Sequence, residues 1–427
     1  MGDPAQPDAS GSAVSGSAAP IQLATMGMFI IDTFRFIDPR TGQDLGNRGL
    51  EDQIGGGGCY FAIGARMWLP PGALQMVIDR GCDWKPEDQQ VLDRYDQTAA
   101  TTSAVGPPSM WHYRSRPDRT TRAVNIYTGE HRGFDYLSPK IRLEPSDLLA
   151  CSPCAPPALP QWIHLICSPE RALETIAQIN AVLNAEKSPG ARSASSFPKL
   201  VYEPIPDSCV FDNLDECLRV LPSLAVFSPN HEEAAALLGL STEWEHICQQ
   251  AAADPTGGTQ SIIDFVTSKL AGGFVAHLQR THAPPDGTAG EAFGPIMCIR
   301  SGAWGSVVGR AGLGFQHVPA WHSASARKAE AEGGLDCSPE RIRDVTGAGN
   351  SFLGGFSAYL VQTESQSQLD PGTRMREAAM HGAVSASLVI EQLGLPHFDV
   401  VDGKKLWNGH TAAQRLELLR DRQTPAS

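Results

Sequence analysis

The sequence has no apolar run that approaches the roughly 20 consecutive residues needed to cross a lipid bilayer. Residues 1–22 are poor in apolar side chains and lack the basic-then-apolar order of a signal peptide, so we interpret them as a disordered tail. Positive charge is also scarce, since 34 lysines and arginines stand against 47 aspartates and glutamates. The formal charge of −13 argues against nucleic acid as the main partner, because phosphate backbones attract basic surfaces. We therefore expect neither a nucleic-acid partner nor a membrane partner.

The cysteines do not form a dense, closely spaced framework. All ten are scattered along the chain between Cys59 and Cys337. This distribution favours reduced thiols in a cytoplasmic protein over a disulfide scaffold. The one close pair, Cys151 and Cys154, has no second pair at a suitable spacing and lies in a proline-rich stretch. Two ordinary loop thiols are therefore favoured over a redox or zinc half-site.

Strand-like and helix-like patterns alternate along the chain of 427 residues, which is long enough for one large α/β domain or two ordinary ones. The apolar run that ends at Asp32 predicts one buried strand feeding a loop. The strand-like run "QWIHLICS" is followed by a helical pattern with Pro169 near its start. Such alternation predicts an α/β fold with a mainly parallel sheet covered by helices on both faces.

The boundaries follow from changes in this pattern. We expect one domain over residues 23–412 and a C-terminal tail over 413–427. A hairpin pattern within 120–137 is too polar for a buried sheet. We therefore expect this hairpin and its neighbours, at about 33–55 and 110–137, to form a small β lid. Two segments rich in small and polar residues, about 281–294 and 322–340, are interpreted as inserted loops.

A glycine-bracketed turn opens an apolar helix in the last third of the chain. The backbone N–H groups of Gly347, Ala348, Gly349 and Asn350 stand at the start of this helix. Amides at a helix start form a concave donor surface, and the helix dipole adds positive potential, so the turn is suited to a phosphoryl oxygen. A dinucleotide fingerprint is rejected, because Phe352 occupies the position of its third glycine.

The stretch "DVTGAGNSFLGGF", residues 344–356, resembles the C-terminal signature of the PfkB (ribokinase-like) carbohydrate kinase family. Other motifs follow in the family's order, and the chain is most similar to the fungal maintenance-of-killer branch. The resemblance implies a three-layer α/β/α fold with a β lid. It also implies ATP- and Mg²⁺-dependent phosphoryl transfer to a hydroxyl of a sugar or nucleoside-like metabolite. Family lids often form dimer contacts, so a homodimer through the lid is one alternative that the resemblance leaves open.

Asn350 departs from the family pattern, in which an aspartate at this position is the base for the substrate hydroxyl. An amide has no useful basicity, and general-base catalysis typically supplies about 10²–10⁴-fold in rate. Phosphoryl transfer nevertheless depends mainly on positioning and charge stabilisation. Two hypotheses therefore stay open: a kinase with weakened or altered catalysis, or a degenerate pseudokinase that acts as a nucleotide- or metabolite-binding or scaffold protein.

Four residues near the N-terminus correspond to the family's acceptor site. Asp32 matches the aspartate that binds sugar hydroxyls, although an aspartate at a strand end also caps its own turn. Gly56 and Gly57 match the glycine turn that brings backbone close to the substrate. Tyr60 stands at or near the place of a family asparagine, which argues against an ordinary sugar substrate.

Asn230 and Glu233 match the family's Asn-x-x-Glu motif, which organises Mg²⁺ and phosphate largely through water. The same spacing before an apolar run is that of a helix capping box. One pair of residues can serve both purposes. We assign Glu233 to the Mg²⁺ side, through water, and Asn230 to the nucleotide side.

The remaining nucleotide assignments are spread over three motifs. Gly302 and Gly305 match a Gly-x-x-Gly turn beside ATP, although a plain hairpin explains them nearly as well. Thr346, which directly precedes the glycine turn, is also assigned to the nucleotide. Ala386 and Ser387 lie where the family forms its adenine pocket, with core packing as the equally good alternative.

Asp344 matches the family aspartate that shapes the glycine turn. In some members of the family it also contributes to a monovalent-cation site. Whether K⁺ binds near Asp344 is left open by the sequence.

Overall fold

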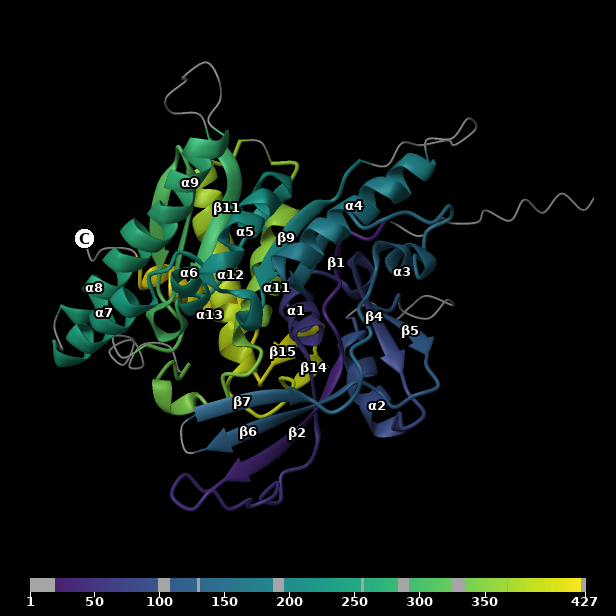
Figure 1. Cartoon of the computed structure of the whole chain (residues 1–427). Coiled ribbons are helices and arrows are strands. Elements are labelled where there is room, and N and C mark those ends of the chain that lie inside the picture. Colours follow the sequence, from purple (N-terminus) through teal and green to yellow (C-terminus); the bar gives the residue numbers. More distant parts are fainter. Residues whose placement is uncertain are drawn as a thin grey trace, which may run out of the picture.

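The computed structural model describes residues 20–98, 108–128, 131–186, 196–254, 257–282, 292–323, 335–366 and 368–423. Its centre is a nine-stranded sheet in the order β13-β12-β11-β10-β9-β8-β1-β4-β5 (Figure 1). These strands are β1 (Leu23–Thr25), β4 (Leu74–Arg80), β5 (Trp111–Ser115), β8 (Trp162–Cys167), β9 (Lys199–Pro204), β10 (Leu224–Phe227), β11 (Phe293–Arg300), β12 (Ser306–Ala311) and β13 (Gly314–Val318). Neighbours from β5 through to β11 are parallel, and the pairs β11–β12 and β12–β13 are antiparallel, so only β12 of these strands runs in the opposite direction. The predicted, mainly parallel sheet is confirmed.

Both faces of the sheet are buried, and alternate residues of one strand enter different cores. Leu23 belongs to one core and Ala24 to the other, and the same holds for Met76 and Val77. One face is covered by α1 (Gly57–Arg66), α2 (Pro86–Tyr95), α11 (Ala348–Gln362), α12 (Pro371–Val389) and α13 (Ala412–Asp421). The other is covered by α3 (Pro145–Ala150), α4 (Pro169–Glu186), α5 (Leu214–Val220), α6 (His231–Leu237), α7 (Ser241–Ala253), α8 (Gly258–Phe265) and α9 (Gly272–His282). Because strand side chains alternate with a period of two, this is the predicted three-layer α/β/α architecture.

A separate four-stranded sheet projects beside this body (Figure 1). Its order is β3 (Gln53–Gly55), β2 (Ile30–Ile37), β6 (Arg122–Thr128) and β7 (His131–Tyr136). The hairpin predicted within 120–137 is the antiparallel pair β6–β7. The range 110–137 is nevertheless divided, because β5 pairs with β4 in the large sheet. A two-stranded ribbon consists of β14 (Phe398–Val401) and β15 (Lys404–Trp407). Its Phe398 and Trp407 are buried in the main core, which is the core on the side of α1, α11 and α12.

The prediction of one buried strand ending at Asp32 is wrong. The apolar run is divided between β1 in the large sheet and β2 in the small one, with the break at residues 26–29. Asp32 is therefore the third residue of β2 rather than a residue after a strand. An apolar run alone does not show where the chain changes sheets, because both halves are buried.

The C-terminal segment also differs from its prediction as a tail. Thr411 and Gln414 form a capping box that starts α13, and Leu416 and Leu419 on this helix are buried in the main core. Of the N-terminal tail, residues 1–19 lie outside the described part of the chain, as do 283–291 and 324–334 of the two expected loops. No helix among the described residues is both long and apolar enough to span a membrane. The cysteines are free thiols, Cys151 and Cys154 included.

Candidate active site

The glycine turn is shaped by Asp344. Its Oδ1 accepts hydrogen bonds from the Thr346 amide at 3.0 Å and from Thr346 Oγ1 at 2.8 Å. Gly347 follows in the left-handed region with φ of 75° and is the N-cap residue of α11. The amide of Ala348 donates to the Val345 carbonyl at 3.2 Å. The Ala348 amide, which the sequence predicts to face an anion, is thus already hydrogen-bonded within the tight turn.

Tyr60 lies directly beneath the turn. A Cβ built on Gly347 would be 2.2 Å from Cγ of Tyr60, so the ring fills the space that a side chain would need. The same ring lies beside Gly55, whose built Cβ would be 3.6 Å from Tyr60 Cε2 and 2.0 Å from Oδ2 of Asp32. The structure thus brings Asp32, Tyr60 and the turn into one contiguous group, with Asp32 and Tyr60 both buried.

Arg300 approaches the turn from β11. A Cβ on Gly349 would stand 2.0 Å from Nη1 of Arg300, so a glycine is required for the guanidinium to reach this place. Nη1 pairs with Oε1 of Glu203 at 2.6 Å, and Nη2 donates to the Ser228 carbonyl at 3.0 Å. A buried guanidinium, paired with a carboxylate, therefore stands at the start of α11 where a side chain of residue 349 would otherwise lie.

Glu203 connects three side chains at the end of β9. Its Oε2 accepts from Nδ2 of Asn350 at 2.8 Å and lies 3.2 Å from Nε2 of His164. His164 is held in turn by Thr25 Oγ1 at 3.0 Å and by stacking on Phe61. Burial favours the protonated form of Glu203, but the charge of Arg300 and the hydrogen bonds from His164 and Asn350 hold its pKa below the ordinary value. Glu203 is thus a buried carboxylate that fixes the orientation of the Asn350 amide.

Asn230 and Glu233 form the capping box of α6. Asn230 Oδ1 accepts from the Glu233 amide at 2.8 Å, and Glu233 Oε2 accepts from the Asn230 amide at 2.7 Å. The same Oε2 lies 3.6 Å from Nη2 of Arg300, which links the cap to the turn. Burial raises the pKa of Glu233 to about 7, against the opposing charge of Arg300. Asn230 and Glu233 therefore do form the helix capping box that was the alternative interpretation of this motif. Glu233 nevertheless remains close to the turn through Arg300.

A cavity of about 210 Å³ adjoins the turn, and we call it the turn cavity. Its lining includes Gly302, Gly305, Ala348, Gly349, Ala386 and Ser387. Residues from two motifs that the sequence assigned to a nucleotide thus meet the glycine turn around one space. Thr346 and Asn230 are not among the described residues that line it.

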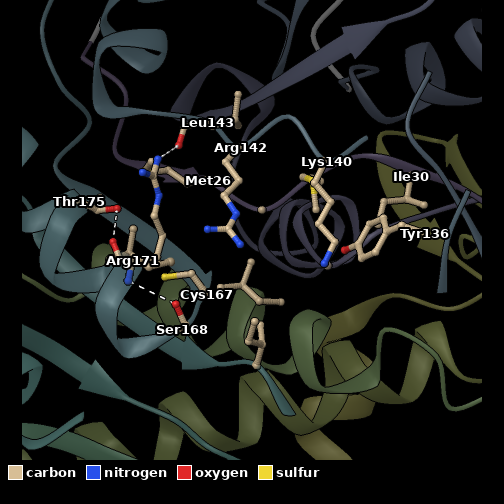
Figure 2. Close-up of a pocket in the computed structure, with 16 residues that line it drawn as sticks. Met26, Ile30, Tyr136, Lys140, Arg142, Leu143, Cys167, Ser168, Arg171 and Thr175 are labelled. Atoms are coloured by element: carbon tan, nitrogen blue, oxygen red, sulfur yellow. Dashed lines mark hydrogen bonds between the residues drawn. The ribbon is translucent and has the colours of Figure 1, made fainter. Parts of the chain in front are cut away.

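A second cavity, of about 130 Å³, lies beside the start of α1, and we call it the arginine cavity (Figure 2). Its basic side chains are Lys140, Arg142 and Arg171. Gly57 also lines it, and a Cβ on Gly57 would be 3.2 Å from Nδ2 of Asn350. Asn350 therefore adjoins the arginine cavity through Gly57 and the turn cavity through its neighbour Gly349. Asp32, Gly56 and Tyr60 are not among the described residues that line the arginine cavity.

The residues around the turn fit a direct Mg²⁺ site poorly. Mg²⁺ prefers carboxylate oxygens, but Glu203 is paired with Arg300, and Glu233 is engaged in its capping box. The described residues contain no group of three or more acidic, histidine or cysteine side chains placed to hold a metal ion. The Asp344 oxygen that bonds Thr346 is similarly committed to the turn. Protein side chains alone therefore do not form a Mg²⁺ site here.

No family model matches the sequence. The chain is 27% identical over 408 residues to Protein MAK32 of Saccharomyces cerevisiae, covering 92% of this chain and 90% of that protein. It is 28% identical over 404 residues to an uncharacterised protein of Schizosaccharomyces pombe, covering 93% of this chain and 92% of that protein. Both of these relatives are fungal.

Solved structures of ribokinases superpose on nearly the whole chain. The ribokinase of Giardia lamblia gives a TM-score of 0.53 at 15% identity, covering 94% of this chain and 99% of its own. The ribokinase of Cryptococcus neoformans, in complex with ADP, gives 0.51 at 17% identity with the same coverage. This chain has a ribokinase-like fold. A third structure, the nucleoside kinase of Methanocaldococcus jannaschii from the ribokinase family, covers 93% of this chain with a TM-score of 0.50 at 14% identity.

Sequence reasoning missed the buried polar group that supports the ribokinase-like turn. Arg300 lies two residues before the Gly-x-x-Gly motif, and Glu203 lies near the end of β9, yet neither position carries a motif of its own. A charged residue inside an otherwise apolar strand run was the available signal, since such a charge needs a buried partner. The cations of the arginine cavity gave no comparable signal, because they come from a loop and a helix that are distant in sequence.

Proposed function

We propose that this chain is a PfkB-type kinase-like protein of the fungal maintenance-of-killer branch, which transfers a phosphoryl group from ATP to a hydroxyl of a small sugar- or nucleoside-like metabolite. The observation that carries this proposal is the position of Asn350 between the two cavities. A phosphoryl donor in one cavity and an acceptor in the other would meet at this residue. Phosphoryl transfer requires such an in-line arrangement more than it requires covalent chemistry from the protein.

ATP is assigned to the turn cavity. Gly302 and Gly305 would allow close approach of the nucleotide, and Ala386 and Ser387 leave room for a flat base. The phosphates would lie at the Gly349 end, where the start of α11 favours an anion. A ribokinase-like protein solved with ADP supports this assignment. Mg²⁺ would enter with the nucleotide, held chiefly by phosphate oxygens and water, with Glu233 acting through water at most.

The acceptor hydroxyl is assigned to Asn350 and Asp32. Because Nδ2 of Asn350 donates to Glu203, its Oδ1 is left to accept a hydrogen bond from the hydroxyl. Asn350 would position the nucleophile without removing its proton, which would pass to water or to a phosphate oxygen. We therefore expect slow phosphoryl transfer to a correctly positioned hydroxyl.

The second candidate is a nucleotide- or metabolite-binding protein without turnover. The amide at position 350 favours it, because no basic group replaces the family's aspartate. Tyr60 favours it as well, since its ring occupies the space beneath the turn. The kinase and the nucleotide-binding form of the second candidate both predict that ATP binds; only the kinase predicts that ADP forms.

Calorimetric titration with Mg²⁺-ATP and an ADP-release assay over a panel of sugars and nucleosides separate the two candidates. Ala386→Phe should fill the turn cavity and abolish ATP binding, whereas Ala253→Phe at the exposed end of α7 should leave it unchanged. ADP release that depends on an acceptor supports the kinase. Binding without ADP release supports the second candidate, and absence of ATP binding excludes the kinase and the nucleotide-binding form of the second candidate.

A further inference from the structure

The arginine cavity concentrates positive charge in a protein whose formal charge is −13. Lys140 and Arg142 come from the segment after β7, and Arg171 comes from the first turn of α4. Figure 2 shows their side chains around one space, with Tyr136 and Cys167 on its walls. Arg171 and Arg142 differ in whether protein groups already balance their charge.

Arg171 is committed to the fold. Its Nη2 donates to the Leu143 carbonyl at 3.2 Å (Figure 2) and lies 3.8 Å from Glu144. Its Nη1 pairs with Glu174 at 2.6 Å. Two carboxylates and a carbonyl thus surround this guanidinium. Arg171 ties α4 to the segment that carries Arg142, and its charge is largely balanced.

Arg142 has no such partner. No hydrogen bond or ion pair joins it to any residue that the structure describes, and its guanidinium points into the cavity (Figure 2). Its charge reaches both walls, because it partly offsets the rise in pKa that burial causes for Tyr136 and Cys167. Lys140 adds a second cation, with Nζ 4.1 Å from the centre of the Tyr136 ring.

The cavity is placed beside the proposed acceptor position. Gly57 on its wall faces Nδ2 of Asn350, and the Tyr136 hydroxyl is close enough to Asp32 for that carboxylate to raise its pKa. A molecule held between Asp32 and Asn350 would therefore extend toward Arg142. The volume of about 130 Å³ leaves room there for a compact terminal group.

We propose that the acceptor carries a compact anionic group, a phosphate ester or a carboxylate, and that Arg142, assisted by Lys140, binds it in the arginine cavity. That the bound molecule is the phosphoryl acceptor rests on the proposed function; the presence of an anion site at Arg142 does not. A guanidinium offers paired N–H donors that match the oxygens of either anion, and the charge makes these hydrogen bonds stronger than neutral ones. Neutral sugars would leave this cation without a counter-charge.

The test is a calorimetric titration of the full chain with inorganic phosphate while a non-hydrolysable ATP analogue fills the turn cavity. Glucose, glucuronate and glucose 6-phosphate follow as probes, because they differ only in a hydroxyl, carboxylate or phosphate at one carbon. The variants are Arg142→Gln, Arg142→Lys and the control Arg94→Gln, an exposed arginine on α2. Arg142 is itself exposed, so its replacement should leave the fold intact.

We expect phosphate to bind and Arg142→Gln to weaken its binding by about 10-fold or more, the effect of losing one charge-assisted hydrogen bond. Arg142→Lys should lose less, and Arg94→Gln should bind as the parent does. The preferred sugar derivative distinguishes a phosphate ester from a carboxylate as the natural group. Equal binding in Arg142→Gln and the parent, or no binding of any anion, overturns the proposal. The analogue is titrated separately, so that a failure of ATP binding counts against the proposed function alone.

Discussion

The side-chain amide of Asn350 donates a hydrogen bond from Nδ2 to Oε2 of the buried Glu203 carboxylate at 2.8 Å. An aspartate at position 350 would place a second carboxylate against the first. Two carboxylates at hydrogen-bonding distance cannot both be ionised without a large cost, so one would keep a proton. Asparagine at position 350 therefore suits an ionised Glu203, whereas aspartate there does not.

We expect Asn350→Asp alone to destabilise the protein and to give little gain in turnover. The new carboxylate would exchange an attractive contact for a repulsive one in a buried place, at a cost on the order of 3 kcal/mol at pH 7. Urea unfolding of the variant and of the parent measures this difference. A variant as stable as the parent would show that Glu203 is not a charged neighbour of position 350.

We expect the double variant Asn350→Asp/Glu203→Gln to recover much of this stability. The glutamine can donate to the aspartate, which is then free to ionise and to act as a general base. ADP release on a responsive acceptor should rise by about 10²-fold over the parent. Glu203→Gln alone is the control, since it removes the same charge from Arg300 without adding a base. Equal rates in the control and the double variant would contradict a missing base as the limiting factor.

Arg300 should be the most costly single residue to remove from this group. Arg300→Met would leave Glu203, and partly Glu233, buried without their counter-charge. Breaking a buried pair from one side costs about 3–5 kcal/mol, whereas Arg219→Met, at an exposed pair with Glu216, should cost less than about 1 kcal/mol. Urea unfolding at pH 7 measures both. Similar losses in the two variants would mean that Arg300 is well hydrated rather than buried with its partners.

Much of this site could be predicted from local sequence patterns, and the rest could not for identifiable reasons. The start of α11 at the glycine turn and the capping box of α6 depend on neighbouring residues, so the sequence predicts them. The division of the first apolar run between two sheets depends on long-range pairing of β2 with β6. The contact of Arg300 with Glu203 likewise joins residues 97 positions apart on different strands (300 − 203). No periodicity or local motif reports such a pair.

Gly347→Ala tests the packing of the turn on Tyr60. Gly347 has φ of 75°, and a Cβ there would also lie 2.2 Å from Tyr60 Cγ. Gly42 has φ of 70° with no atom within 4 Å of its built Cβ, so Gly42→Ala reports the backbone strain alone, about 1–2 kcal/mol. We expect Gly347→Ala to cost distinctly more in urea unfolding. In a Tyr60→Ala background, Gly347→Ala and Gly42→Ala should cost similar amounts of unfolding free energy. If Gly347→Ala still costs more there, contact with Tyr60 is not the cause of the extra loss.

Glu233 should give the protein a stability that falls as the solution becomes less acidic. Burial raises the pKa of Glu233 from 4.5 to about 7 in the folded chain. Between these values the unfolded chain has released the proton while the folded chain still holds it, so raising the pH favours unfolding. The contribution has a slope of at most about 1.4 kcal/mol per pH unit from roughly pH 4.5 to 7 and levels off above.

Urea unfolding at half-unit steps from pH 5 to 8 isolates this effect when the parent is compared with Glu233→Gln. Glutamine keeps the capping box, because its side-chain oxygen can still accept from the Asn230 amide, but it cannot ionise. The difference in unfolding free energy between variant and parent should therefore widen in favour of the variant as the pH approaches 7. The exposed neighbour Glu232→Gln should show no such trend. A constant difference across the range would mean that Glu233 is already ionised at pH 5, with Arg300 balancing its charge throughout.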